Sequence, residues 1–133
     1  MRTTVLDVDT SGRPFLDLTG DVERFCSPEG DGLCNVFVPH ATAGVALFEL
    51  YAGSEDDVAE AIGRLLPRDG RWQHRHGSPG HGADHVLPVF VSPSLVLPVV
   101  GGRPALGTWQ YVVMVDTNGD NPRRQVRLSF LPG

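Results

Sequence analysis

The segment VPHATAGVALFE, Val38 to Glu49, carries His40 and Glu49 in an otherwise apolar run. A carboxylate is rarely buried, because leaving water costs several kcal/mol unless the charge is paired. Either the polar residues lie where the run opens into a pocket, or the run is not part of the core. The flanking stretches GLCNVFV and TAGVALFEL are β-rich, so we expect strands at 32–38 and 42–50.

Further stretches also have the composition or the alternation that is typical of strands. They are residues 4–10, 94–100, 108–117 and 124–131. The Asn118-Gly119 pair between the last two is a strong hairpin signal, although that connection is longer than two residues. We therefore expect a mainly antiparallel sheet.

The clearest helix is SEDDVAEAIGRLLP, residues 54–67. Its apolar residues recur at spacings of three and four, which gives one apolar face and predicts a surface helix lying on a sheet. Ser54 with Asp57 resembles a capping box, with Asp where Glu or Gln is usual. Pro67 is expected to end the helix.

A shorter helix is expected at 18–25, with Thr19 as its cap. The apolar run that precedes Ser92 fits either a strand or a helix. Together these elements predict an α+β fold. We expect a single domain over residues 1–133, in which one or two helices pack on a mainly antiparallel sheet.

The composition narrows the classes of partner. The chain has 133 residues and a formal net charge of -5, which disfavours nucleic acid because nucleic acid is usually met by a basic face. No apolar run approaches the roughly 20 residues that span a bilayer. The opening MRTTVLDVDTSG has no apolar block after its arginine, so we expect a cytoplasmic protein with neither a secretory signal nor a membrane partner. Cys26 and Cys34 form no CxxC motif and are most simply small apolar residues.

Residues 67–85 hold four of the five histidines, at positions 74, 76, 81 and 85, among glycines and prolines. Any single one of them is best interpreted as a solvated loop residue. As a group they favour a site, because neutral imidazole binds metals and titrates near neutrality. Their spacing matches no closed zinc signature such as HExxH. Trp72 indicates an ordered loop, since a large aromatic normally packs against something.

Other candidate residues each have a plain structural interpretation. Glu49 fits a strand end that reaches solvent, or a pocket rim where it would act as acid, base or ligand. Strand alternation would place Trp109 in the core and Gln110 outside it. Arg123 and Arg124 could hold an anionic group, because guanidinium matches phosphate oxygens, although exposed turn arginines are common.

Taken together, these pieces resemble the YjbQ-like family, which is associated with a secondary thiamine-phosphate synthase activity. The family pattern is HTTAG followed by a glutamate, then Y-x-H, N-x-x-x-H, GTWQ and a closing PR corner. The matching segments run from about Asp17 to Phe130, in the same order and spacing. They are His40 to Gly44 with Glu49, Trp72 to His74, His81 to His85, Gly107 to Gln110, and Pro122-Arg123.

The resemblance implies an α+β subunit that assembles as a homotrimer, with a pocket near the subunit interface. It also implies that a helix begins near His85. The residues that it suggests for catalysis are His40, Glu49 and His85. The residues that it suggests for substrate binding are Thr42, Trp109, Gln110 and Arg123. A divalent metal, Mg²⁺ or Zn²⁺, would be bound by His40, His74 and His85.

The implied reaction joins a pyrimidine pyrophosphate to a thiazole phosphate and releases pyrophosphate, so the partner would be a small anionic or phosphorylated substrate. The chain departs from the family pattern at Ala41, Trp72, His81, Asn121 and Gln125. Two alternatives stay open: a metal- or small-anion-binding trimer without efficient catalysis, and a metal-dependent hydrolase.

Overall fold

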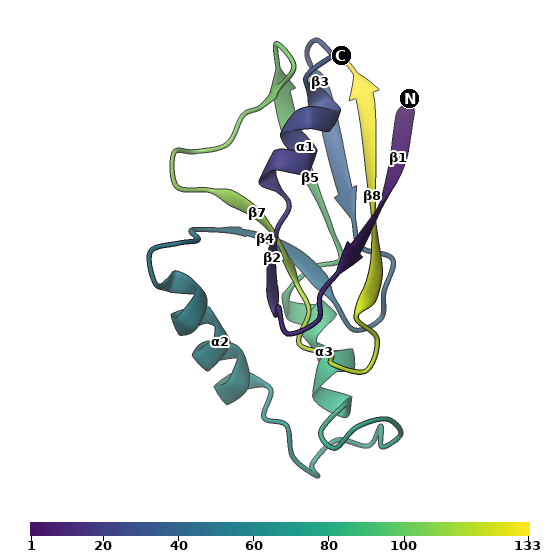
Figure 1. Cartoon of the computed structure of the whole chain (residues 1–133), viewed down its shortest axis with the longest axis vertical. Helices are drawn as coiled ribbons and strands as arrows, with labels where there is room; N and C mark the ends of the chain where they lie inside the picture. Colours follow the sequence, from purple (N-terminus) through teal and green to yellow (C-terminus); the bar gives the residue numbers. More distant parts are fainter.

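Figure 1 shows the chain as a computed structural model that describes residues 1–133. Two antiparallel sheets contain all the strands. The five-stranded sheet has the order β1 (Arg2–Asp9), β8 (Arg123–Pro132), β3 (Gly32–Phe37), β5 (Ser94–Val100) and β6 (Arg103–Pro104). The three-stranded sheet has the order β2 (Phe15–Asp17), β7 (Tyr111–Val115) and β4 (Gly44–Phe48). The helices are α1 (Thr19–Cys26), α2 (Ser54–Leu65) and α3 (Gly82–Phe90), so the predicted α+β class is confirmed.

The main core lies between the inner faces of the two sheets and α1. Strand β8 shows why: its alternate residues Arg124, Val126, Leu128 and Phe130 are buried, while their neighbours face outward. This is the period of two that a strand imposes on its side chains. The core is completed by α1, through Val22 and other apolar residues, and by the inner side chains of β4 and β7.

The hairpin expected at Asn118-Gly119 is wrong. The strands before and after Asn118-Gly119 form no hairpin, because β7 and β8 belong to different sheets. The side chains of Asp116 and Asn118 accept hydrogen bonds from backbone N–H groups two residues ahead, which turns the chain from one sheet to the other. Strands β3 and β4, which follow each other in the chain, also lie in different sheets.

The predicted strand at 108–117 begins late. Residues 107–110 form a turn, closed by a bond from the Gly107 N–H to Oε1 of Gln110 at 2.8 Å. Trp109 is 69% exposed and is not a core residue, against the expectation from strand alternation. The GTWQ segment therefore lies on the surface, just before β7.

Both predicted helix caps are wrong, although both helices form. Gly53, with φ +99°, takes the N-cap position of α2, and the Glu55 carboxylate accepts from the backbone N–H groups of Tyr51 and Gly53. The Thr19 hydroxyl does not cap α1 but accepts the N–H of Val112 at 2.9 Å, which ties α1 to β7. At α1 a distant backbone donor thus takes the Thr19 oxygen, whereas at α2 the contacts at the helix start are local.

Helix α2 does not lie on a sheet. It has no buried residue, and in Figure 1 it stands beside the strands rather than across them. At its C-terminal end, Ile62 and the C-cap residue Leu66 join a small apolar cluster with Ala83 and Leu87 of α3 and Val115 of β7. Helix α3 itself occupies part of the run that fitted either strand or helix, as the family resemblance implied. No helix is both long enough and apolar enough to cross a bilayer.

Candidate functional site

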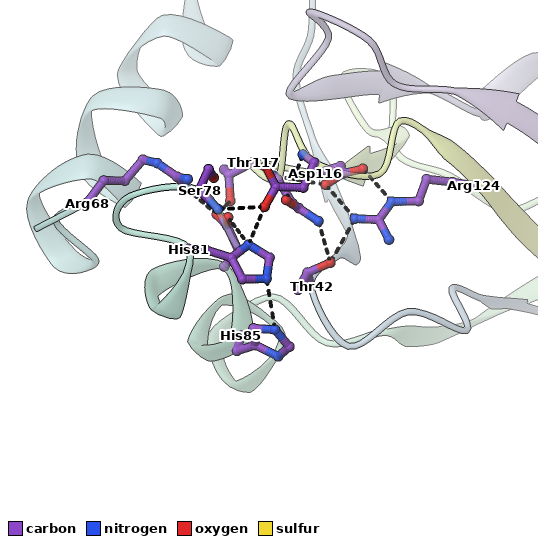
Figure 2. Close-up of polar contacts among 11 residues, drawn as sticks. Thr42, Arg68, Ser78, His81, His85, Asp116, Thr117 and Arg124 are labelled. Atoms are coloured by element: carbon purple, nitrogen blue, oxygen red, sulfur yellow. Dashed lines mark hydrogen bonds and ion pairs between the residues drawn. The ribbon is translucent and has the colours of Figure 1, made fainter. Parts of the chain in front are cut away.

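The loop after α2 and the first turn of α3 bring four histidines together. The ring centre of His74 lies 3.9 Å from that of His76 and 4.0 Å from that of His85. His81 occupies the N-cap position of α3, and His85 follows one turn later on the same side of the helix. Their Nε2 atoms are 3.1 Å apart, as Figure 2 shows.

Three of these imidazoles form a candidate metal centre. Ligand atoms of His74, His81 and His85 all lie within 4.8 Å of one another. A tetrahedral ion at about 2.0–2.1 Å from its ligands holds neighbouring ligand atoms roughly 3.3 Å apart, close to the observed Nε2 separation. Nδ1 of His74 is buried without a hydrogen-bond partner, so one ring nitrogen in this cluster is left for another interaction.

The environment of His74 and His85 favours the neutral imidazole that can bind a metal. Burial lowers the pKa of His85 below its ordinary value of 6.5, and the neighbouring histidines lower it further. Burial is also the main cause that lowers the pKa of His74, followed by His76 and His81. Protons therefore compete weakly with a metal at these rings.

Trp72 and a glycine fix the loop against the helix. The Trp72 indole N–H donates to the carbonyl of Pro67 at 2.8 Å. A Cβ on Gly82 would lie 2.4 Å from Cβ of Trp72 and 2.8 Å from the carbonyl oxygen of His74. Only glycine allows α3 to approach the loop this closely, and that approach places His74 next to His85. The loop is ordered, as the tryptophan indicated.

Carboxylates surround His81 on the side away from His85. Asp84 is fully buried; its Oδ1 accepts from the Thr117 hydroxyl at 2.8 Å and from the guanidinium of Arg68. Its Oδ2 lies 3.3 Å from Nδ1 of His81, and Oδ2 of Asp120 lies 3.4 Å from the same atom. Neither contact has hydrogen-bond geometry, although both are within ion-pair distance.

His40 lies outside this cluster, in a groove of about 620 Å³ on the five-stranded sheet. Its Nε2 accepts the backbone N–H of Gln125 at 2.9 Å, and the exposed Arg123 lines the same groove. Burial lowers the pKa of His40, and the positive charge of Arg124 lowers it further. The groove therefore offers the His40 imidazole and the Arg123 guanidinium, beside the carboxylates of Asp7 and Asp9.

Thr42 and Arg124 form a buried network between the groove and the histidines, drawn in Figure 2. Nε of Arg124 pairs with Asp116 at 2.8 Å, and its Nη2 donates to the Thr42 hydroxyl at 2.7 Å. Asn118 donates to the same hydroxyl at 3.2 Å. Thr42 thus has protein partners inside the chain, and its oxygen is not open to a ligand.

Glu49, Trp109 and Gln110 lie at the other end of the three-stranded sheet. Phe48 pairs with Tyr111, so Glu49 and the GTWQ turn share the edge that lies beyond this pair. The segment that leads to Thr42 lies at the opposite end of β4, roughly 16 Å away at about 3.3 Å per residue. One chain therefore does not bring these three residues to the histidine cluster.

The comparisons agree with the pattern in the sequence. The family model described as "UPF0047 protein YjbQ-like" matches residues 4–133. This chain belongs to the YjbQ-like family. A UPF0047 protein of Mycobacterium tuberculosis is 63% identical over 133 residues, which is all of both chains.

Solved structures of other YjbQ-like or hypothetical proteins have the same fold. A hypothetical protein from Aeropyrum pernix is 37% identical over the whole of both chains, with a TM-score of 0.88. A member of the YjbQ/UPF0047 family from Clostridium acetobutylicum is 26% identical, with a TM-score of 0.86; the match covers 96% of this chain and 99% of that one.

Within this YjbQ-like protein, sequence reasoning underrated two residues of the cluster. His81 belonged to the histidine group that favours a site but was given no role as a ligand, and Asp84 was given no role at all. A signal for both exists in the sequence, because His81, Asp84 and His85 stand at spacings of three and four and share one face of a helix. Recognising it required a helix where propensity left the choice open.

Proposed function

We propose that this YjbQ-like protein is a metal-dependent enzyme that acts on a small phosphorylated substrate. The observation that carries the proposal is the convergence of ligand atoms from His74, His81 and His85 within 4.8 Å. A divalent ion bound there would neutralise charge that develops on a departing phosphate, or would activate water. The imidazoles would bind the ion in their neutral form, which burial favours at His74 and His85.

A hollow beside the histidines supports a small substrate. It has a volume of about 400 Å³, and His74 and His81 line it together with Arg68 and Arg75. The guanidinium of Arg68 is paired with the Asp84 carboxylate, whereas that of Arg75 is exposed and only donates to the Gly70 carbonyl. Arg75 is therefore free to bind an anionic group close to the ion.

The family resemblance suggests the specific reaction. It is the joining of a pyrimidine pyrophosphate to a thiazole phosphate, with release of pyrophosphate. Arg75 beside the hollow and Arg123 with His40 in the groove would offer positive or neutral contacts to two anionic substrates in an acidic chain. In this proposal His40 and Arg123 bind substrate, and the histidine cluster binds the ion.

A homotrimer is part of the same proposal. Glu49, Trp109 and Gln110 lie a strand length from the histidines within one chain. A neighbouring copy could supply these residues to the cluster, which would reunite the predicted pocket at a subunit interface. The exposed indole of Trp109 supports this arrangement, because a large aromatic on a surface is typical of contact sites.

A metal-dependent hydrolase is the second candidate. Three protein ligands leave a fourth position of a tetrahedral ion open, as in catalytic zinc sites that activate water. This chemistry needs only the cluster and the hollow that one chain provides. It therefore predicts activity that does not depend on Glu49 or Gln110.

The experiment incubates purified protein with both thiamine precursors and with Zn²⁺ or Mg²⁺, and identifies products by mass spectrometry. Thiamine phosphate indicates the synthase, and pyrophosphate released without coupling indicates the hydrolase. His85→Ala and an excess of chelator should each abolish turnover, while Arg64→Ala on the exposed face of α2 is the matched control. Turnover that chelator leaves intact would contradict the proposal. No turnover by the metal-loaded protein would leave only metal or anion binding.

A further inference from the structure

We infer that Asp84 is the positioning residue of the histidine cluster, and that it holds His81 with the Nε2 lone pair facing the metal position. The inference rests on the proposed function for its purpose, but the orientation of His81 can be observed without any metal. The Asp84 carboxylate is buried, and a carboxylate is costly to remove from water unless partners compensate.

The two carboxylate oxygens of Asp84 differ in their hydrogen-bond partners. Its Oδ1 is held by the Thr117 hydroxyl and by the guanidinium of Arg68. Its Oδ2 has no hydrogen bond and lies 3.3 Å from Nδ1 of His81, which has none either. A buried acceptor and a buried ring nitrogen without partners therefore face each other. Buried polar atoms are seldom left unpaired, so this pair needs an explanation.

The tautomer of His81 follows from electrostatics. If the proton is on Nδ1, an N–H dipole points toward the oxygens of Asp84 and Asp120, at 3.3 and 3.4 Å. If the proton is on Nε2, a nitrogen lone pair faces both carboxylates, which is repulsive. The carboxylates therefore select the Nδ1–H form. That form leaves the Nε2 lone pair directed toward Nε2 of His85 at 3.1 Å, where two ligands of one ion would meet.

Asp84 is better suited to this role than Asp120. The Asp84 side chain is 1% exposed, and contacts from two directions fix its orientation. The Asp120 side chain is 31% exposed, and its Oδ2 already accepts the backbone N–H of Ser78 at 3.0 Å. Helix α3 places Asp84 three residues after His81, so the carboxylate and the ring are attached to one rigid element.

The class of metal follows from the ligand set. Three neutral imidazoles suit Zn²⁺ and similar transition metals, whereas Mg²⁺ prefers carboxylate oxygens and water. His81 is decisive, because it stands where the family pattern has asparagine. A carboxylate that orients it strengthens the imidazole as a ligand, and removal of such a partner typically lowers metal affinity about 10–100-fold.

Two measurements test the inference. The ring nitrogens of His81 in metal-free protein report the tautomer by ¹⁵N NMR, and competition with a chromophoric chelator gives the Zn²⁺ affinity. We expect the Nδ1–H form in the wild type, a shift toward Nε2–H in Asp84→Asn, and a loss of Zn²⁺ affinity of about 10–100-fold in that variant. Asp120→Asn should have a smaller effect. Asp57→Asn is the control, because it makes the same change of charge at an exposed position of α2 and should change neither the tautomer nor the Zn²⁺ affinity.

An Nε2–H tautomer in the wild type would overturn the inference, as would an Asp84→Asn variant with unchanged tautomer and Zn²⁺ affinity. The wild-type spectrum decides the matter even if Asp84→Asn does not fold. A wild type that binds no Zn²⁺ contradicts the proposed function alone, because the tautomer still supports or overturns the role of Asp84.

Discussion

Among single residues, the Arg124–Asp116 pair shows how much of the interior depends on charge. Both side chains are almost completely buried, and Asp116 also accepts from the Thr10 hydroxyl at 2.7 Å. A buried pair adds little net stability, but removing one partner leaves an uncompensated charge in the core. The pair also fixes Thr42 and the turn that leads to Thr117, so it supports the segment that holds Asp84.

Replacing Asp116 should therefore destabilise the fold strongly. Asp116→Asn keeps the shape of the side chain but leaves Arg124 charged and unpaired, so the free energy of unfolding should fall by about 3–5 kcal/mol. Urea denaturation followed by tryptophan fluorescence measures this. Asp21→Asn breaks the exposed pair with Arg24 and should cost less than about 1 kcal/mol. Equal losses in the two variants would show that burial does not set the cost.

The histidines give the metal-free protein a defined pH dependence. The pKa values of His40 and His85 in the folded chain lie below the ordinary 6.5. As the pH falls, the unfolded state binds protons first, so stability is full above about pH 7 and decreases through pH 6.5 toward the folded pKa values. Urea midpoints measured with chelator between about pH 7.5 and 5.5 should fall steadily. A urea midpoint that rises as the pH falls would contradict the lowered pKa values of His40 and His85.

Residue patterns predicted part of the site. The crowding of histidines in residues 67–85 indicated a site, and the structure does bring His74 and His85 together. It places His40 elsewhere, because β3 ends at Phe37 and the following turn runs along the five-stranded sheet toward Gln125. The convergence of distant residues depends on which strands pair, and local spacing carries no information about that pairing.

For the secondary-structure elements, the periodicity of the sequence predicted whether a segment forms a helix or a strand. It did not predict which elements pair or pack with one another. Strand β8 follows the alternation visible in its sequence, and α2 follows its spacing of three and four. The hairpin signal at Asn118-Gly119 was misleading because the side chains of Asp116 and Asn118 turn the chain into the other sheet. The cap of α1 was misassigned because the Thr19 oxygen bonds to a distant strand, and that of α2 because Gly53 takes the N-cap position.

The contact between α3 and the loop gives a prediction at this scale. Gly82→Ala adds a Cβ 2.4 Å from that of Trp72, so the backbone or the indole must move, at a cost of about 1–3 kcal/mol in the free energy of unfolding. The same displacement should weaken Zn²⁺ binding, because His74 lies on the loop that moves. Chemical denaturation and chelator competition measure the two effects.

The matched control for this substitution is Gly63→Ala in α2. A Cβ there meets nothing within 4 Å, and alanine has the higher helix propensity, so stability should rise by up to about 1 kcal/mol. If Gly82→Ala were equally harmless, the close approach of helix and loop would not be what positions His74.

On the scale of the whole molecule, apolar surface gathers on the outer face of the five-stranded sheet. Leu33 is exposed between its cross-strand neighbours Leu131 and Pro98, and Val96 and Val100 are exposed on the neighbouring strand β5. A contiguous apolar face of this kind is uncommon on a monomer and is typical of an interface. It supports the proposed trimer independently of the site.

We expect light scattering to give the mass of three copies at micromolar concentration. Leu33→Asp should shift the population toward the monomer, because a charge opposite a second copy would lose its water without gaining a partner. Arg64→Ala, on the exposed face of α2, is the control. A wild type whose mass by light scattering is that of one chain would contradict both the trimer and the shared pocket.

The central claim is that His74, His81 and His85 hold one transition-metal ion within a single chain. Diffraction at the zinc edge from crystals of the Zn²⁺-loaded protein tests it most directly. We expect one anomalous peak per chain, about 2.0–2.1 Å from a ring nitrogen of each of the three histidines. The peak should be lost in His81→Asn. An anomalous map with no peak at these rings, or with its peaks at other residues, would contradict it.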